Sequence, residues 1–262
     1  MIKPFFLVAA VLLAAHVKAA DKFLLYHVNK QVQWIHDGKK ETAKRGVFLL
    51  PKQSIIISNN ADVMLIQGDG KSLLLDKPGS FTFDQIKQLL KTIKPESVSK
   101  NFFAYVFEKF LSGSDGNEKQ KVAAVVYRGK QLMQTPDDSS FVFTISKLFW
   151  KADYPSAPHR IEIIVNGVSF DTIIRKNLSI TIPQHLTGQE KKTGSVVQWR
   201  CYPADSKQPP PMFLLILPAQ KDSVTIQKQL MHLRKTYQNR KSMLQLMEKD
   251  LFERWLDFYS NK

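Results

Sequence analysis

The stretch RIEIIVNGVSFDTII, residues 160–174, carries the clearest fold signal in the chain. Isoleucine or valine stands at every second position from 161 to 165, which is the spacing of a strand with one buried face. Asn166-Gly167 follows, and this pair is typical of a tight hairpin turn because both residues accept a positive φ. The residues after the turn return to a strand-like pattern, so the stretch predicts two antiparallel strands.

Further strand-like segments flank this hairpin, and together they predict a β-sandwich over residues 122–220. The segments lie at residues 123–128, 141–150, 160–165, 168–174, 178–182, 196–202 and 212–217. Trp150 and Trp199 belong to apolar strands and are expected in the core. Cys201 lies two residues beyond Trp199 on the same strand face, so we expect a small buried hydrophobe rather than a nucleophile.

The N-terminal part of the chain predicts a small antiparallel β module followed by two amphipathic helices, within residues 20–111. The strand-like segments lie at residues 23–28, 31–35, 46–50, 54–58, 63–66, 72–75 and 80–83. Residues 84–92 have helical spacing with Asp84 as the N-cap. Residues 97–111 carry an aromatic stripe that we expect to pack on a sheet. The predicted fold class is therefore mainly β with helical additions.

Two segments differ from these β modules in composition. Residues 112–121 contain almost no apolar side chain and are expected to link the two modules. The C-terminal segment, residues 221–262, is expected to be helical, because residues 223–261 lack glycine and proline and carry apolar residues at helical spacing. One continuous helix and two helices with a bend near Gln238-Asn239-Arg240 both fit this pattern.

The N-terminus has the order of an export signal. Over residues 1–19, Lys3 precedes an apolar run at 5–15, and Val17 and Ala19 occupy the positions that a signal peptidase reads. The run is too short to cross a bilayer, since about 11 helical residues span roughly 16 Å. We therefore expect a periplasmic or secreted protein that is cleaved before Ala20 and has no transmembrane helix in its mature chain.

Charge and composition narrow the classes of partner. The 262 residues are 44% hydrophobic and 23% charged, which is typical of a folded chain of about two modules. Removal of the signal leaves 36 basic and 23 acidic side chains, a formal charge of +13. Export argues against nucleic acid as the partner. The basic balance then favours an envelope protein partner or an anionic envelope surface.

The sequence contains none of the common catalytic motifs, such as GxSxG, HExxH or a glycine-rich dinucleotide fingerprint. A single cysteine cannot form an internal disulfide, a Cys-rich zinc site or a CxxC motif. Gly70-Lys71-Ser72 resembles the end of a phosphate-binding loop, but position 65 is leucine, so a hairpin turn is expected. We expect no enzyme activity, no cofactor and no metal, because the mature histidines are scattered without ligand spacing: His27, His36, His159, His185 and His232.

Residues 32–83 resemble the FecR-like β domain of bacterial envelope proteins. The resemblance rests on Gln31-Val32-Gln33, Gly46-Val47-Phe48-Leu49-Leu50-Pro51, Ser54-Ile55-Ile56-Ile57, Ala61-Asp62-Val63-Met64-Leu65-Ile66, Gly70-Lys71-Ser72-Leu73-Leu74-Leu75 and Pro78-Gly79-Ser80. In that family a periplasmic sensor signals through a membrane helix to a cytoplasmic segment. This chain shows neither of those parts, so the resemblance implies an exported β module and no signalling role.

Residues 141–217 look like a fibronectin type III or related immunoglobulin-like domain. Phe149-Trp150 lies in an early strand and Val197-Gln198-Trp199-Arg200-Cys201 in a late one. These are core positions of that fold, so the resemblance implies a sandwich and nothing about a ligand.

The first functional hypothesis is a non-enzymatic envelope protein that acts as an interaction or scaffold component. A glycan- or peptidoglycan-binding module is an alternative, and it would require exposed aromatic residues such as Trp34 to line a groove, although core packing is the commoner role. An enzyme subunit with a site between the two β modules is a third hypothesis, and it would require histidines gathered beside a carboxylate.

The candidate surface site is a basic strip in the C-terminal segment. No acidic residue lies between Asp222 and Glu248, whereas five cations do: Lys228, Arg234, Lys235, Arg240 and Lys241. On a continuous helix at 100° per residue, the cations at 234, 235 and 241 would share one face. The strip is either the solvated face of a helix or a docking surface for an acidic partner or anionic envelope surface.

Overall fold

The computed structural model describes residues 22–93, 97–113, 133–135, 138–143, 147–151, 157–183, 193–207 and 209–261. The chain divides into two compact units, Met1–Glu118 and Lys119–Lys262. The fold is mainly β, with 39% of the described residues in strands and 32% in helices, which confirms the predicted class at that level. The expected signal lies outside the described residues, and so does the expected linker apart from its first two residues.

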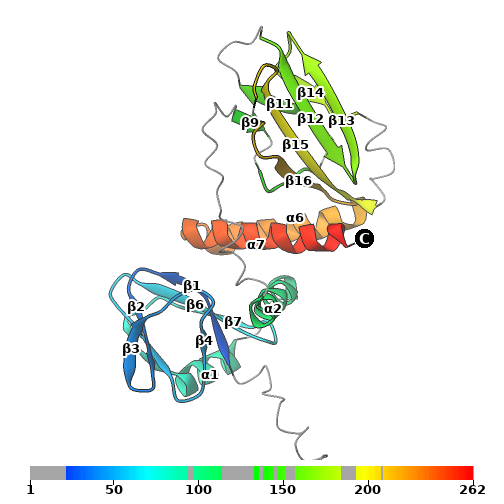
Figure 1. Cartoon of the computed structure of the whole chain (residues 1–262). Helices are drawn as coiled ribbons and strands as arrows, with labels where there is room; N and C mark the ends of the chain where they lie inside the picture. Colours follow the sequence, from blue (N-terminus) through cyan, green and yellow to red (C-terminus); the bar gives the residue numbers. More distant parts are fainter. Residues whose placement is uncertain are drawn as a thin grey trace, which may run out of the picture. The chain divides into compact units, whose positions relative to one another are not determined.

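The first unit contains two four-stranded antiparallel sheets (Figure 1). One sheet has the order β4-β1-β6-β7, from β1 (Phe23–Asn29), β4 (Phe48–Leu49), β6 (Asp62–Gln67) and β7 (Ser72–Leu75). The other has the order β3-β2-β5-β8, from β2 (Val32–His36), β3 (Lys39–Thr42), β5 (Ser54–Ile57) and β8 (Gly79–Thr82). The sequence pattern did not predict β3, because this edge strand is fully exposed and has no apolar alternation.

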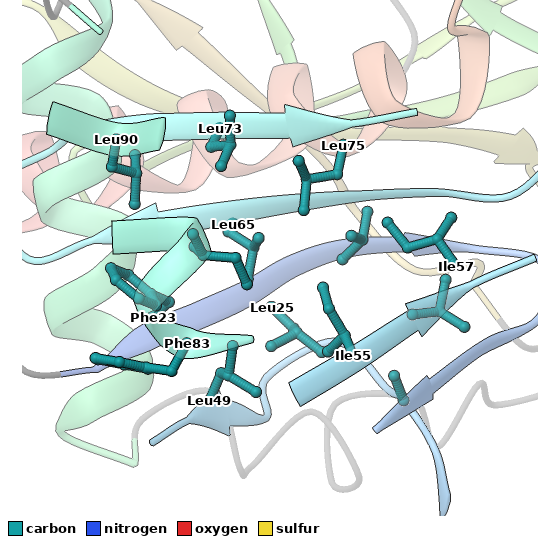
Figure 2. Packing of buried hydrophobic residues seen from close by; sticks show 14 of the residues in the cluster. Phe23, Leu25, Leu49, Ile55, Ile57, Leu65, Leu73, Leu75, Phe83 and Leu90 are labelled. Atoms are coloured by element: carbon teal, nitrogen blue, oxygen red, sulfur yellow. The ribbon is translucent and has the colours of Figure 1, made fainter. Parts of the chain in front are cut away.

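The two sheets of the first unit enclose one apolar core. Figure 2 shows Phe23 and Leu25 of β1 facing Ile55 of β5, with Phe83 and Leu90 of α1 (Phe83–Thr92) at the same core. All five residues are at most 3% exposed. Successive side chains of a strand point to opposite faces of the sheet. The residues of β1 and β6 that do not face this core therefore point to the other side of their sheet.

Helix α1 begins one residue earlier than predicted, so the prediction of Asp84 as its N-cap is wrong. The N-cap is Thr82, whose hydroxyl accepts a hydrogen bond from the Gln85 backbone N–H at 3.3 Å. The Gln85 side chain returns a bond by accepting from the Thr82 backbone N–H at 2.8 Å. This reciprocal capping box satisfies two backbone donors, whereas Asp84 lies in the first turn, where its charge favours the helix dipole.

Helix α2 (Ser97–Leu111) covers the second face of the β4-β1-β6-β7 sheet. Its side chains Phe102, Phe103, Val106 and Phe107 are at most 2% exposed, and Phe103 packs edge-on against Tyr26 of β1 with ring centroids 6.2 Å apart. The prediction that the aromatic stripe is a packing face is therefore confirmed. Burial on both faces explains why β1 and β6 read as continuous apolar runs.

The second unit contains a five-stranded and a three-stranded sheet on either side of one core. The larger has the order β10-β16-β15-β12-β13, from β10 (Ser140–Phe141), β12 (His159–Val165), β13 (Val168–Ile174), β15 (Ser195–Pro203) and β16 (Phe213–Leu217). The smaller has the order β14-β11-β9, from β9 (Met133–Thr135), β11 (Lys147–Lys151) and β14 (Ser179–Thr181). Trp150, Trp199 and Cys201 are buried in this core as predicted.

Two sequence expectations about these strands have different outcomes. The 160–174 hairpin is confirmed, since β12 and β13 pair from His159 with Ile174 to Val165 with Val168 across the Asn166-Gly167 turn. The single strand expected over 141–150 is wrong. Its two ends belong to different sheets, because β10 pairs in parallel with β16 whereas β11 pairs with β9 and β14. The strand expected at 123–128 lies outside the described residues.

The C-terminal segment is an antiparallel pair of helices, α6 (Gln220–Tyr237) and α7 (Lys241–Ser260), so the two-helix alternative is correct. Arg234 is paired with Glu248, and the Trp255 indole N–H donates to Gln229 at 3.3 Å. Helix α7 contacts β15 and β16 (Figure 1). Within the described residues, no helix combines the length and the apolar character needed to cross a bilayer.

Candidate functional site

The exposed side of α6 carries a mixed row of aliphatic and basic side chains. Val224, Lys228, Met231 and Lys235 follow one another at helical spacing, and we call these four residues the outer stripe of α6. Val224 is 55% exposed and Met231 is 65% exposed. The opposite side of the helix is apolar and buried, because Ile226, Leu230 and Leu233 pack inward. The outer stripe therefore combines apolar and basic side chains, and these side chains are exposed to solvent.

The five predicted cations do not lie on one face of a single helix. Lys228, Arg234 and Lys235 belong to α6, Arg240 is the N-cap of α7, and Lys241 is its first residue. The continuous-helix geometry expected for 234, 235 and 241 is wrong, because the chain reverses after Tyr237. The turn itself brings the four cations from 234 to 241 to one end of the hairpin.

Arg234 pairs with a carboxylate on the other helix of the hairpin. The Arg234 Nε donates to Glu248 Oε1 of α7 at 2.6 Å, although the Arg234 side chain is 63% exposed. Such an exposed pair contributes little to stability, about 0.2–1 kcal/mol. It nevertheless offsets part of the charge of the strip, so Lys228, Lys235 and Lys241 are better candidates for contacting a partner.

The cations in the last turn of α6 and those at the start of α7 lie at opposite ends of a helix dipole. Arg234 and Lys235 lie in the last turn of α6, where cations are favoured by the negative end of the helix dipole. Arg240 and Lys241 instead lie at the positive end of α7, which has no acidic residue in its first turn and no side-chain cap. Helix stability therefore explains the cations of α6 and does not explain those of α7.

Two adjoining hollows lie beside helix α6 in the α6–α7 hairpin. They have volumes of about 490 and 460 Å³, and both are lined by Phe143, Leu230 and Arg234. Met231 and Lys235 complete the first, whereas the second includes Glu248 among its lining residues. The hollows thus combine apolar side chains with charged groups at their edges.

The described histidines are distributed over four separate elements. His27 lies 3.5 Å from Asp62, and His36 lies 3.3 Å from Glu41, so each has a carboxylate of its own. His159 is 2% exposed, and burial lowers its pKa below 6.5. His185 lies outside the described residues. No cluster of three or more His, Cys, Asp or Glu side chains suited to a metal occurs in the described part of the chain.

Two further candidate residues have structural surroundings. Burial raises the pKa of the Cys201 thiol to about 12, so Cys201 is a neutral thiol at physiological pH and a poor nucleophile. Trp34 is partly buried against the core of the first unit, and its indole N–H donates to Gln53 at 3.0 Å. It also stacks on His36 with ring centroids 3.9 Å apart. These contacts agree with core packing rather than a free aromatic platform.

The sequence did not predict a network of charged residues on the outer face of the five-stranded sheet. Arg160 donates twice from Nε to the Asp171 carboxylate, at 3.0 and 3.1 Å, and these hydrogen bonds lower the pKa of Asp171. Glu162 accepts hydrogen bonds from Arg200 and from the Tyr202 hydroxyl. Cross-strand pairing brings these residues together from β12, β13 and β15, so the charges on this face are matched internally.

The fold and the hairpin define a β-rich protein of two units whose second unit presents a basic, partly apolar helical surface. Comparison with known proteins gives no match, whether to protein-family models, to curated proteins or to solved structures. Its function is therefore inferred from its own residues.

Proposed function

We propose that this chain is an exported bacterial envelope protein without enzyme activity, which acts as an interaction or scaffold component. In this proposal the outer stripe of α6 and the start of α7 dock an acidic partner protein. Residues 1–19 act as the export signal, residues 32–83 as a FecR-like module and residues 141–217 as a fibronectin-like sandwich. The excess of basic side chains supports an acidic partner.

The charge at the start of α7 is the observation that carries the proposal. Cations at a helix N-terminus cost about 0.3–1 kcal/mol each, because they repel the positive end of the dipole. Arg240 and Lys241 occupy that end, and the first turn of α7 contains no acidic residue. A partner carboxylate beside them would remove the repulsion and would also accept from backbone N–H groups that α7 leaves without a side-chain cap.

The aliphatic residues and the hollows favour a protein over a lipid surface. Met231 is 65% exposed beside a hollow lined by Phe143 and Leu230. A partner side chain can fill such a hollow and exclude water from the neighbouring charges. Exclusion of water strengthens the electrostatic attraction between these charges and the partner. A bilayer surface would contact the projecting cations and leave the hollow unfilled. We therefore place the acidic partner protein first and treat an anionic lipid surface as an outcome of the test.

The test reverses the three cations that have no ion pair within the described residues: Lys228→Glu, Lys235→Glu and Lys241→Glu. Arg234 is left in place because its reversal would oppose Glu248. Retention of the mature protein on envelope fractions should fall by about tenfold or more at low salt, since about 0.5–1 kcal/mol is expected for each contact. High salt should weaken retention of the native protein in the same way.

The matched control carries an equal change of charge on the first unit, Lys39→Glu, Lys40→Glu and Lys77→Glu, and should be retained like the native protein. Unchanged retention of the α6–α7 variant at low salt, with native circular dichroism, would refute the docking surface. Retention on protein-free anionic vesicles that equals retention on envelope fractions would replace the partner protein by a lipid surface. An intact Met1 on the protein recovered from cells would refute export.

A further inference from the structure

The second unit contains a larger cavity, distinct from the hollows along α6. It has a volume of about 780 Å³, within the range of roughly 300–1,000 Å³ that small-molecule sites occupy. Three parts of the fold form it: the β12–β13 turn with Asn166, the outer face of β15 with Val196 and Gln198, and the end of α7 with Tyr259 and Ser260. Residues far apart in the sequence therefore converge on one site.

The described lining residues combine polar and apolar side chains and carry no charge. Amide and hydroxyl side chains come from Asn166, Gln198 and Ser260, and apolar surface comes from Ile164 and Val196. No Asp, Glu, Lys, Arg or His is among the described lining residues. Ile164 of β12 pairs with Gln198 of β15 in the cavity wall. Two residues further along the same strands, Glu162 pairs with Arg200.

These neighbouring charges are already satisfied by the protein. Glu162 accepts from Arg200 and from the Tyr202 hydroxyl, and Arg200 also donates to the Pro210 carbonyl at 3.2 Å. An anionic ligand would therefore meet no uncompensated cation among the described lining residues. A purely aliphatic ligand would strip water from the amides without replacing its hydrogen bonds, which costs about 1–3 kcal/mol for each group.

Gln198 is the polar group most available to a ligand. It lies half-buried on the outer face of β15, and its side-chain amide has no hydrogen-bond partner among the described residues. An amide both donates and accepts, so it matches a pair of neighbouring hydroxyl groups. Strand β15 holds the backbone of Gln198 in place, so its side chain is presented at the wall of the cavity.

A tightly packed wall keeps the cavity in shape. Gly194 has a φ of +72°, and a Cβ there would lie 2.4 Å from the Tyr259 ring and 2.8 Å from the Ala219 nitrogen, so glycine is required. The Tyr259 hydroxyl accepts from the Ala219 N–H at 3.0 Å and donates to Asp222 at 2.8 Å. These contacts hold the end of α7 against the start of α6 and against Gly194, the residue before β15.

We propose that this cavity binds a neutral, hydroxylated ligand of the oligosaccharide class. Sugar hydroxyls would pair with the Gln198 amide, and the apolar face of a sugar ring would pack on Ile164 and Val196. This site is independent of the docking surface at α6, because the cavity and the outer stripe share no lining residue.

The experiment uses the full chain and three neutral trisaccharides, maltotriose, cellotriose and tri-N-acetylchitotriose, with anionic trigalacturonic acid as a comparison. Calorimetry and saturation-transfer NMR measure binding. At least one neutral trisaccharide should bind, and Gln198→Leu should weaken it about tenfold or more, since the amide hydrogen bonds are lost. Gln88→Leu on the exposed side of α1 is the matched control and should bind like the native protein.

Binding that survives Gln198→Leu unchanged would overturn the proposal, as would the absence of binding by all three neutral probes at millimolar concentration. Tighter binding of the anionic probe would overturn the neutral class. The variant with Lys228, Lys235 and Lys241 reversed should bind the trisaccharide normally. Failure of the docking surface and failure of the cavity site can thus be told apart.

Discussion

His159 opens strand β12 and is the most fully buried histidine of the described residues, at 2% exposed. Its ring centroid lies 6.1 Å from that of Trp150, and its Nδ1 atom has no hydrogen-bond partner. Burial lowers the pKa of His159 below 6.5, and the neighbouring Ala157 backbone offsets this only in part. Folding of the second unit therefore favours the neutral form of this imidazole.

A lowered pKa at His159 gives the second unit a pH dependence of definite sign. Below pH 6.5 the unfolded chain takes up a proton at this residue more readily than the folded chain does, so the free energy of unfolding falls with falling pH. His159→Gln, which keeps a neutral polar side chain, should show a smaller fall between pH 7.5 and 5. Urea unfolding followed by tryptophan fluorescence measures this, because three of the four tryptophans, Trp150, Trp199 and Trp255, lie in the second unit.

The matched control for this prediction is His36→Gln in the first unit, which should leave the pH dependence of the second unit unchanged. An equal fall of the unfolding midpoint in the native and His159→Gln proteins would contradict the assigned role of His159.

At the scale of elements, the β6–β7 hairpin turn is fitted closely to helix α2. Gly70 has a φ of +82°, and a Cβ there would lie 2.1 Å from the backbone oxygen of Lys100. The Asp69 side chain accepts from the Lys71 backbone N–H at 3.1 Å and completes the turn. The glycine in Gly70-Lys71-Ser72 is therefore required by turn geometry and by helix packing, and the expectation of a hairpin turn is confirmed.

Gly70→Ala should destabilise the first unit by about 2–4 kcal/mol, because it adds a clash with backbone to the cost of a positive φ. Gly38→Ala is the matched control, since Gly38 has a φ of +73° but nothing within 4 Å of the added carbon. It should cost only about 1–2 kcal/mol. Chemical unfolding followed by circular dichroism gives both values, and equal losses would show that the approach of α2 to the turn is not tight.

At the scale of the whole molecule, the chain comprises two units, each with its own apolar core. The polar, glycine-bearing composition of residues 112–121 predicts few protective contacts in that segment. Limited proteolysis of the folded protein should therefore cut first within residues 112–121 and release two fragments, which mass spectrometry identifies. First cleavage inside residues 141–182 would show that the boundary is drawn wrongly.

The sequence by itself determined the local features of this protein. Alternation of apolar residues and the Asn166-Gly167 turn predicted the β12–β13 hairpin correctly, because both features depend only on neighbouring residues. Helical spacing likewise predicted the buried face of α2 and the inward face of α6. The basic residues of the candidate docking surface could be found because charge is visible without any knowledge of the fold.

Tertiary structure alone decided how these elements combine. It split residues 141–150 between two sheets, reversed the chain after Tyr237, and placed Gln198, Asn166 and Ser260 around one cavity. The physical reason is that sheet partners and cavity walls are chosen by contacts between residues far apart in the chain. Periodicity reports which face of a strand or helix is buried, and it carries no information about what buries it.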